Sequence, residues 1–102
     1  MDSIYLIKST TTSEYKIGVS KNPTKRLSQH QTGNPSLLKL LYEYRTDSAY
    51  EIEAILKRRY SYAKKEGEWF DLSIKEEVGF ISECARIEQS IKSLKEAGNV
   101  FI

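Results

Sequence analysis

Hydrophobic and polar residues alternate over the first 20 positions in a pattern that predicts a β-hairpin. The run Ile4–Ile7 is apolar and aromatic, which is typical of a strand. A polar cluster at residues 10–13 follows, and Tyr15–Val19 again has strand character. We expect these two strands to pair across a turn near residues 10–12.

A short helix is predicted next. Asn22 is a good N-cap, and Pro23 fits the first helical position because its missing N–H is not needed there. The helix should run to Gln31 and stop near Gly33, with Leu27 as its buried anchor.

A third strand is predicted from Leu37 to Arg45, where apolar and polar residues alternate again. Side chains two residues apart lie on the same face of a strand. One face is therefore expected to carry four apolar side chains, those of Leu38, Leu40, Tyr42 and Tyr44.

Apolar residues at three- and four-residue steps predict a second helix, which starts at Asp47 or Ser48 and ends near Lys65. An extended apolar segment, Trp69–Leu72, should follow it. The apolar stripe of this helix comprises Ile52, Ile55, Leu56, Tyr60 and Ala63.

A last helix is expected from Ser73 to Ala97, with Gly98 as its stop. Its wide apolar face comprises Ile74, Val78, Ile81, Ala85, Ile87, Ile91 and Leu94. The apolar tail Val100–Ile102 is expected either to pack back on the domain or to lie in a subunit interface.

The element order predicts an α/β fold of the α+β type, with a small antiparallel sheet and helices laid on it. The chain has 102 residues, which is enough for one compact core and not for two. We therefore expect a single domain over residues 1–102, with its last helix at about 73–97.

Composition narrows the setting. No apolar run approaches the ~20 residues that span a bilayer, and the N-terminus lacks a signal-peptide pattern, so no membrane association is expected. The single cysteine, Cys84, cannot form an internal disulfide, which fits an intracellular, cytoplasmic setting. With one His and one Cys, a His/Cys zinc site is excluded, and a bound metal needs oxygen ligands.

Charge is distributed unevenly along the chain. Residues 1–65 hold 12 Lys or Arg against 6 Asp or Glu, whereas residues 66–102 hold 4 against 8. A basic front and an acidic back indicate a polyanion bound by the first two-thirds of the chain. Two solvated surfaces of opposite sign would give the same pattern.

Tyr5 and Lys16 fall on one face of the predicted hairpin in one of its registers. A nearby ammonium would lower the pKa of the Tyr5 phenol and make it a better base. Gly18 would leave room for a substrate phosphate or a backbone to approach. Tyr and Lys are also common on ordinary strands, so this pair alone does not define a site.

Arg26 and His30 are four residues apart and project from one face of the first helix. The guanidinium suits a phosphate, and the imidazole suits proton transfer near pH 7. Lys21 and Lys25 add positive charge beside them.

Glu53 flanks the apolar stripe of the second helix and is the candidate ligand for Mg²⁺, with Glu51 as its competitor. An ordinary ion pair with Lys57, four residues on, is the alternative for Glu53. The run Lys57, Arg58 and Arg59 is the densest basic patch of the chain and a candidate surface for nucleic-acid phosphates.

Together these residues resemble the GIY-YIG endonuclease superfamily. Ser3-Ile4-Tyr5 and Lys16-Ile17-Gly18 resemble the two halves of its signature. Gly33-Asn34-Pro35 and Gly67-Glu68-Trp69-Phe70 resemble one branch, the small domains related to a T5 phage open reading frame and to a meiotically up-regulated fission-yeast gene product. The resemblance covers about residues 3–72.

The resemblance implies a three-stranded antiparallel sheet flanked by helices and a metal-dependent hydrolysis of DNA phosphodiester bonds. Tyr5 would be the general base or orient the attacking water, and Arg26 would hold the scissile phosphate. His30 would relay a proton, and Glu53 would bind Mg²⁺ or Mn²⁺. Lys16 would assist Tyr5.

Two positions depart from the signature: Ser3 replaces its first Gly, and Lys16 replaces its second Tyr. Some active members of the superfamily resemble this chain in having Lys there. DNA is the expected partner, with RNA left open, and a homodimer or a partner protein is left open as well. The alternatives to a nuclease are a nucleic-acid-binding module that does not cut and an accessory subunit.

Overall fold

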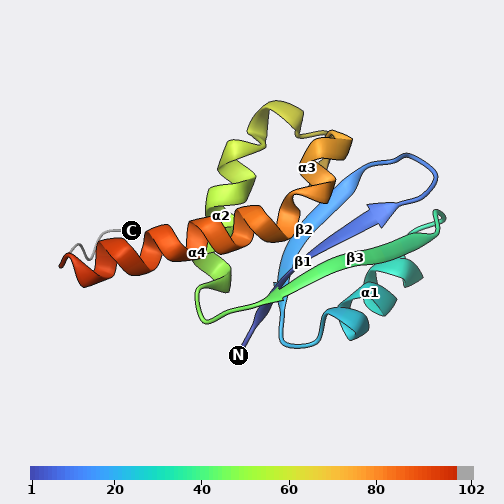
Figure 1. The fold of residues 1–102 in the computed structure, drawn as a ribbon. Helices are drawn as coiled ribbons and strands as arrows, with labels where there is room; N and C mark the ends of the chain where they lie inside the picture. Colours follow the sequence, from blue (N-terminus) through green and yellow to red (C-terminus); the bar gives the residue numbers. More distant parts are fainter. Residues whose placement is uncertain (99–102) are drawn as a thin grey trace.

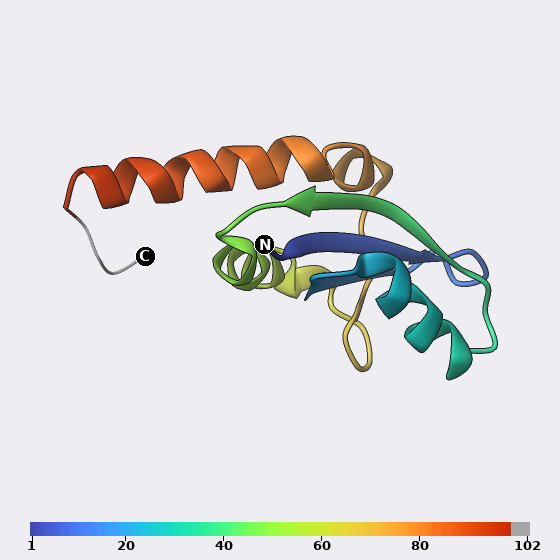
Figure 2. The ribbon, with the colours of Figure 1, turned by 90° about the horizontal axis from the view of Figure 1, so that it is seen from below.

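The computed structural model describes residues 1–98, so the predicted apolar tail Val100–Ile102 lies outside the described part. The elements in chain order are β1 (Ser3–Ser9), β2 (Tyr15–Ser20), α1 (Pro23–Thr32), β3 (Leu38–Arg45), α2 (Ala49–Arg59), the 3-10 helix η1 (Ser61–Ala63), β4 (Trp69–Phe70), α3 (Ile74–Val78) and α4 (Phe80–Glu96). Figures 1 and 2 show α1 on one face of the sheet and α4 on the other. The α+β fold class is confirmed. Within residues 1–98, no helix combines the length and the apolar character that crossing a membrane requires.

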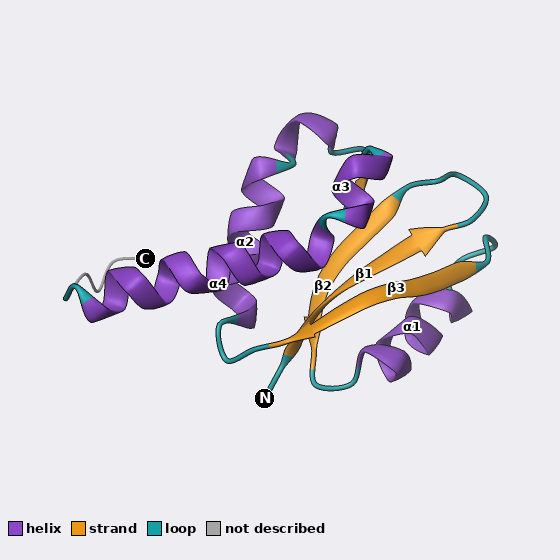
Figure 3. Ribbon diagram, viewed as in Figure 1, coloured by secondary structure: helices purple, strands orange, loops and turns teal. Residues whose placement is uncertain are grey.

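The sheet is antiparallel and has the strand order β3-β1-β2-β4. Figure 3 shows β1 between β2 and β3. The predicted β1–β2 hairpin is confirmed, but the sheet has four strands and not three. The extra strand, β4, pairs only with Tyr15 and Lys16 of β2. Gly67, at φ +66°, provides the left-handed turn that leads into β4.

The predicted single apolar face of β3 is wrong, because the register with β1 shifts within the strand. Leu6 pairs with Tyr42, whereas the next residue, Ile7, pairs with Leu40, so Leu41 is an extra residue on β3. The bulge turns the two halves of the strand to opposite sides. Leu38 and Leu40 therefore pack on the α1 side, and Tyr42 and Tyr44 pack on the α4 side.

The second predicted helix ends earlier than expected, at Arg59 instead of Lys65. The backbone after α2 makes hydrogen bonds with β4 and its neighbours instead of continuing the helix. Lys65 N–H donates to the Trp69 carbonyl at 2.8 Å, and Asp71 N–H donates to the Ala63 carbonyl at 2.8 Å. These bonds tie the segment to β4, which a continuing helix would prevent. Ser48 is the N-cap residue, but its side chain makes no capping hydrogen bond.

The last predicted helix is two helices, separated at Gly79. Ser73 caps the first of them through a capping box with Glu76, so this helix begins where the sequence predicted. The break changes which side chains are buried, because Ile74 and Val78 of α3 are each 65% exposed. The residues of α4 that enter the core are Phe80, Cys84, Ile87 and Ile91.

The core has two parts, one on each face of the sheet. The larger part, between the sheet, α2 and α4, includes Ile4, Leu6, Ile17, Ile52 and Leu56. The smaller part lies under α1 and is formed by Tyr5, Ile7 and Leu38, with Leu27, Leu40 and Trp69 packed against it. The face under α1 is therefore the one that carries Tyr5.

Candidate active site

Tyr5 and Lys16 lie on the same face of the sheet, as predicted. Tyr5 pairs with Gly18, and Ile7 pairs with Lys16. Residues that pair directly, and residues two apart on one strand, share a face. This face is the one that α1 covers.

Gly18 serves a purpose other than the one expected from the sequence. A Cβ atom built at position 18 would overlap the hydroxyl group and ring of Tyr5. The space left by the missing side chain is therefore occupied by the phenol of Tyr5 and not by a substrate. The ring is 3% exposed and lies along β2.

Helix α1 brings Arg26 and His30 to this face. The Asn22 side chain accepts a hydrogen bond from Lys25 N–H at 3.2 Å, so the helix starts where the sequence predicted. His30, one turn beyond Arg26, places its Nε2 atom 3.2 Å from the Tyr5 hydroxyl oxygen. Phenol and imidazole are thus in hydrogen-bonding contact.

Glu53 comes to the same place from α2. Strand β4 pairs with only the first two residues of β2, so the edge of β2 from Ile17 to Ser20 has no β4 partner. Glu53 lies beside this open stretch and forms an ion pair with Lys57 at 3.4 Å. The ion pair and the predicted site therefore coexist.

These side chains line one open hollow of about 220 Å³, which we call the candidate active site. It is walled by the β2 backbone at Ile17, Gly18 and Val19. Its polar lining comprises Tyr5, Lys16, Arg26, His30, Tyr50, Glu53, Lys57 and Glu68. The structure brings together all five residues predicted for catalysis, which come from four different elements.

The pKa of Tyr5 is shifted in the direction opposite to the one expected. Burial raises the pKa of the phenol above its usual value, and the Arg26 guanidinium opposes this without overcoming it. Lys16 points its ammonium over the ring of Trp69, 5.4 Å from the ring centre. The phenol is consequently protonated at neutral pH.

His30 is shifted toward its neutral form. Burial lowers the pKa of the imidazole, and the positive charges of Lys16 and Arg26 lower it further. Glu68 acts in the opposite direction. A neutral imidazole beside a protonated phenol is a matched acceptor and donor.

The residues predicted to bind nucleic acid do not all reach this hollow. Lys57 lines it, whereas Lys21 and Lys25 are exposed and do not. Arg58 lines a different hollow, together with Glu51, and Arg59 pairs with Glu83.

The competitor carboxylate, Glu51, lies 3.8 Å from Lys95 and does not line the candidate active site. Of the two carboxylates considered from the sequence, only Glu53 does so. The structure thus separates two glutamates that the sequence places two positions apart.

Two residues of the lining were missed by the sequence analysis, Tyr50 and Glu68. Tyr50 precedes Glu53 by three positions and so shares its helical face, a signal that could have been used. Glu68 follows the turn at Gly67 and precedes Trp69, which pairs with Lys16. Only the β2–β4 pairing brings Glu68 to the site.

Three aromatic residues, Tyr15, Trp69 and Phe70, are predicted from the sequence to be packing residues and not site residues. Tyr15 is 1% exposed on the opposite face, as predicted. Phe70 is in the core, also as predicted, but Trp69 is only half-buried and lies beside Lys16 on the face of the site.

A divalent cation fits the oxygen donors present. Within residues 1–98, no three His, Cys, Asp or Glu side chains gather into a group that could hold a metal. Mg²⁺ often takes only one or two protein carboxylates and completes its shell with waters and substrate phosphate. Glu53, with Glu68 in the same lining, meets that requirement.

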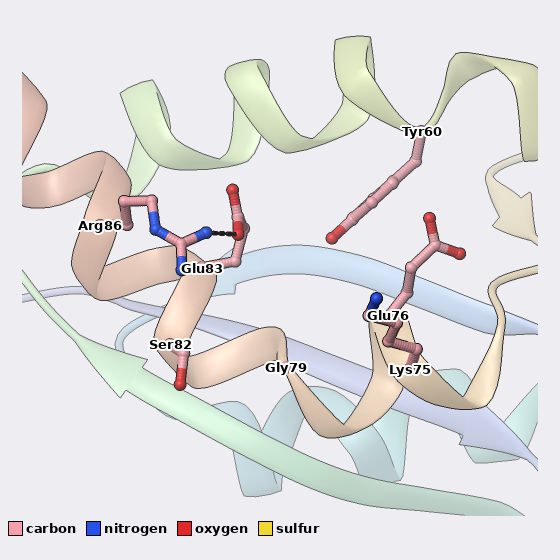
Figure 4. Close-up of a pocket in the computed structure, with 7 residues that line it drawn as sticks. All are labelled: Tyr60, Lys75, Glu76, Gly79, Ser82, Glu83 and Arg86. Atoms are coloured by element: carbon pink, nitrogen blue, oxygen red, sulfur yellow. Dashed lines mark hydrogen bonds and ion pairs between the residues drawn. The ribbon is translucent and has the colours of Figure 1, made fainter.

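A larger hollow, of about 320 Å³, lies between the end of α2 and helices α3 and α4 (Figure 4). None of the predicted site residues lines it. The phenol of Tyr60 extends between Glu76 and Glu83, and burial together with these carboxylates raises its pKa to about 12. Glu83 is paired with Arg59 and Arg86, so its charge is already compensated.

Comparison with known families agrees with the geometry. The family model of the T5orf172 domain matches residues 2–87, which is most of the chain and includes every predicted site residue. Searches among curated proteins and among solved structures found no match. The chain therefore belongs to the T5orf172 domain family, a GIY-YIG-like nuclease family.

Proposed function

We propose that this protein is a divalent-metal-dependent endonuclease that hydrolyses phosphodiester bonds of DNA at the candidate active site. The observation that supports the proposal is the convergence of Tyr5, Lys16, Arg26, His30 and Glu53 on one hollow. Nuclease chemistry needs a proton acceptor, a cation for the phosphate and a carboxylate for the metal. The five side chains supply these groups.

Tyr5 and His30 provide a route for the proton of the attacking water. The phenol is protonated and the imidazole is biased toward its neutral form. Their contact of 3.2 Å lets the phenol pass its proton to His30 Nε2 while its oxygen takes a proton from water. The hydroxide so formed attacks phosphorus, and the bond between phosphorus and the leaving oxygen breaks. The raised pKa of Tyr5 thus favours a relay over a standing phenolate.

Arg26 and Lys16 act on the phosphate. Both cations line the hollow with Tyr5. Arg26 binds the non-bridging oxygens, because its planar fork matches their geometry and its charge offsets the charge that develops there. Lys16, held over Trp69, adds a second positive charge on the side of β2.

Glu53 would hold Mg²⁺ or Mn²⁺, which compensates charge on the phosphate and on the leaving oxygen when bound. Lys57, 3.4 Å from the Glu53 carboxylate, is the residue whose ion pair must rearrange. Its ammonium is long enough and flexible enough to turn to a substrate phosphate.

The test uses supercoiled plasmid with Mg²⁺, with Mn²⁺ and with chelator, and compares the protein with Glu53→Gln and Glu51→Gln. Glu51 is the matched control because it is on the same helix and pairs with Lys95. We expect metal-dependent nicking or linearisation that is lost in Glu53→Gln and kept in Glu51→Gln. Equal loss in both variants would contradict the role of Glu53.

A second candidate function is a nucleic-acid-binding module that does not cut. The departures at Ser3 and Lys16 and the raised pKa of Tyr5 favour it. DNA binding that weakens with salt, without cleavage under any metal condition, would support this function and overturn the first.

A further inference from the structure

A second hollow, of about 170 Å³, adjoins the candidate active site, and we call it the flanking hollow. It is lined by Lys57, Ser61, Lys64, Glu68 and Phe70. Lys57 and Glu68 line the candidate active site as well, so the two hollows share a wall. A polymer that leaves the candidate active site past these two residues enters the flanking hollow.

The lining suits one nucleotide of a strand. Lys57 and Lys64 are flexible cations that bind phosphate as point charges, and the Ser61 hydroxyl can donate to a phosphate oxygen. The buried ring of Phe70 forms an apolar floor that suits a sugar or a base edge. Glu68 repels a phosphate from its own side of the hollow, so the phosphate is favoured beside Lys57 and Lys64.

The rim of the flanking hollow is fixed relative to the candidate active site. Lys64 forms a β-bridge with Phe70, and the neighbouring Lys65 N–H donates to the Trp69 carbonyl at 2.8 Å. Trp69 in turn pairs with Lys16 of β2. Backbone hydrogen bonds thus connect Lys64 to the strand that carries Lys16, and little ordering is needed when a strand binds.

The basic lining continues beyond this point. A further hollow is lined by Lys64 and Lys65, together with Tyr62, Ala63 and Asp71. Lys64 therefore lines two successive hollows. The lysines of these hollows come from α2 and the segment after it. Lys21, just before α1, and Lys25, in α1, line neither the candidate active site nor the flanking hollow.

We infer that the flanking hollow is a subsite for the nucleotide next to the scissile phosphate, on one side only, with the adjoining phosphate bound by Lys64 and Lys57. The inference rests on the proposed function and specifies the path of its substrate. The substrate strand runs from the candidate active site along η1 toward Lys65.

Binding is measured first, with the whole chain, a fluorescent DNA duplex and no added metal, for the protein, Lys64→Ala and Lys39→Ala. Lys39 is an exposed lysine on β3 that lines neither hollow, and so is the matched control. We expect the slope of log affinity against log salt to fall by about one in Lys64→Ala and to stay unchanged in Lys39→Ala.

Cleavage is then mapped on DNA that carries one neutral methylphosphonate at a known position. We expect the unsubstituted protein and Lys39→Ala to cut poorly at one particular bond. This bond lies a fixed number of nucleotides to one side of the neutral linkage. Lys64→Ala should lose this position-dependent protection, because the contact between Lys64 and the phosphate is already absent in this variant. A Ser61→Ala variant should weaken the same protection.

The outcomes separate the inference from the function on which it rests. If cleavage occurs but the neutral linkage gives no position-dependent protection that requires Lys64, the subsite is overturned and the nuclease function is retained. Salt-dependent binding that needs Lys64, without any cleavage, would overturn the nuclease and keep Lys64 as a strand contact. An unchanged salt slope in Lys64→Ala, or no DNA binding at all, would overturn the subsite.

Discussion

The phenol of Tyr5 lies against the backbone of Gly18, the residue that pairs with it across β1 and β2. The ring uses the volume that a side chain at position 18 would fill, and its hydroxyl reaches His30 Nε2 at 3.2 Å. The glycine of the second signature half therefore positions the tyrosine of the first. The two halves are one structural unit.

Gly18→Ala is expected to displace Tyr5 and reduce cleavage. Inserting a methyl group into a packed site costs about 1–3 kcal/mol, and a misplacement of about 1 Å at a reacting group lowers turnover on the order of 100-fold. Gly33→Ala is the control, since nothing lies within 4 Å of a Cβ there. Thermal unfolding and plasmid cleavage measure both effects, and equal activity in the two variants would contradict this role of Gly18.

His30 is the only histidine of the chain, so its titration can be followed by NMR without overlap from other histidine signals. We expect its midpoint below the usual value of 6.5, because burial and then Lys16 disfavour the imidazolium. Lys16→Ala should raise the midpoint, and Lys39→Ala should not. Since the folded state binds the proton less readily than the unfolded chain, His30 should lower the stability as pH falls through this range. A midpoint at or above 6.5 would argue against a neutral relay.

Glu88 of α4 is expected to make the free energy of unfolding depend on pH in the acidic range. It accepts hydrogen bonds from Thr46 and, at 2.7 Å, from the Tyr44 hydroxyl, and these bonds lower the pKa of its carboxyl group. Its contribution is therefore fully present above the usual value of 4.5 and is lost as pH falls through the lowered pKa.

Glu88→Gln should accordingly destabilise the protein at neutral pH by about 1.5–3 kcal/mol, the range for hydrogen bonds to charged groups. Urea unfolding at pH 7 and at pH 3 measures the change. The difference between the protein and the variant should narrow at the lower pH. A difference that widens on acidification would contradict the assignment.

The break at Gly79 predicts which apolar side chains of α3 and α4 stabilise the fold. Ile87 is 2% exposed, so Ile87→Ala should cost about 2–5 kcal/mol. Ile74 is 65% exposed, so Ile74→Ala should change the free energy of unfolding by no more than about 0.5 kcal/mol. Denaturant unfolding of both variants checks this, and similar losses would indicate one continuous amphipathic helix.

Local patterns were sufficient to predict most elements, and the resemblance to the GIY-YIG superfamily singled out the five residues that the structure brings together at the candidate active site. The hairpin, α1 and the helix start at Ser73 depend on signals within a few residues, and each is confirmed. Strand alternation and the helical repeat assign Tyr5, Lys16 and His30 to faces, and the family resemblance identified them as site residues.

The features that were missed depend on contacts between distant segments. Strand β4 forms because Trp69 and Phe70 meet the edge of β2 more than 50 positions earlier, and that pairing also brings Glu68 to the site. The raised pKa of Tyr5 depends on its burial under α1, which spacing alone does not reveal. Gly79 was treated as an ordinary helical position because its neighbours continue the apolar repeat.

The bulge at Leu41 has a consequence for folding. Leu38 and Leu40 need the α1 side of the sheet, whereas Tyr42 and Tyr44 need the α4 side. If β3 slid along β1 by one residue, every side chain would change faces, so the leucines would leave the α1 side and the tyrosines would leave the α4 side. A strand whose two halves need opposite sides of the sheet has one acceptable alignment with β1, so the bulge disfavours folding in a shifted register.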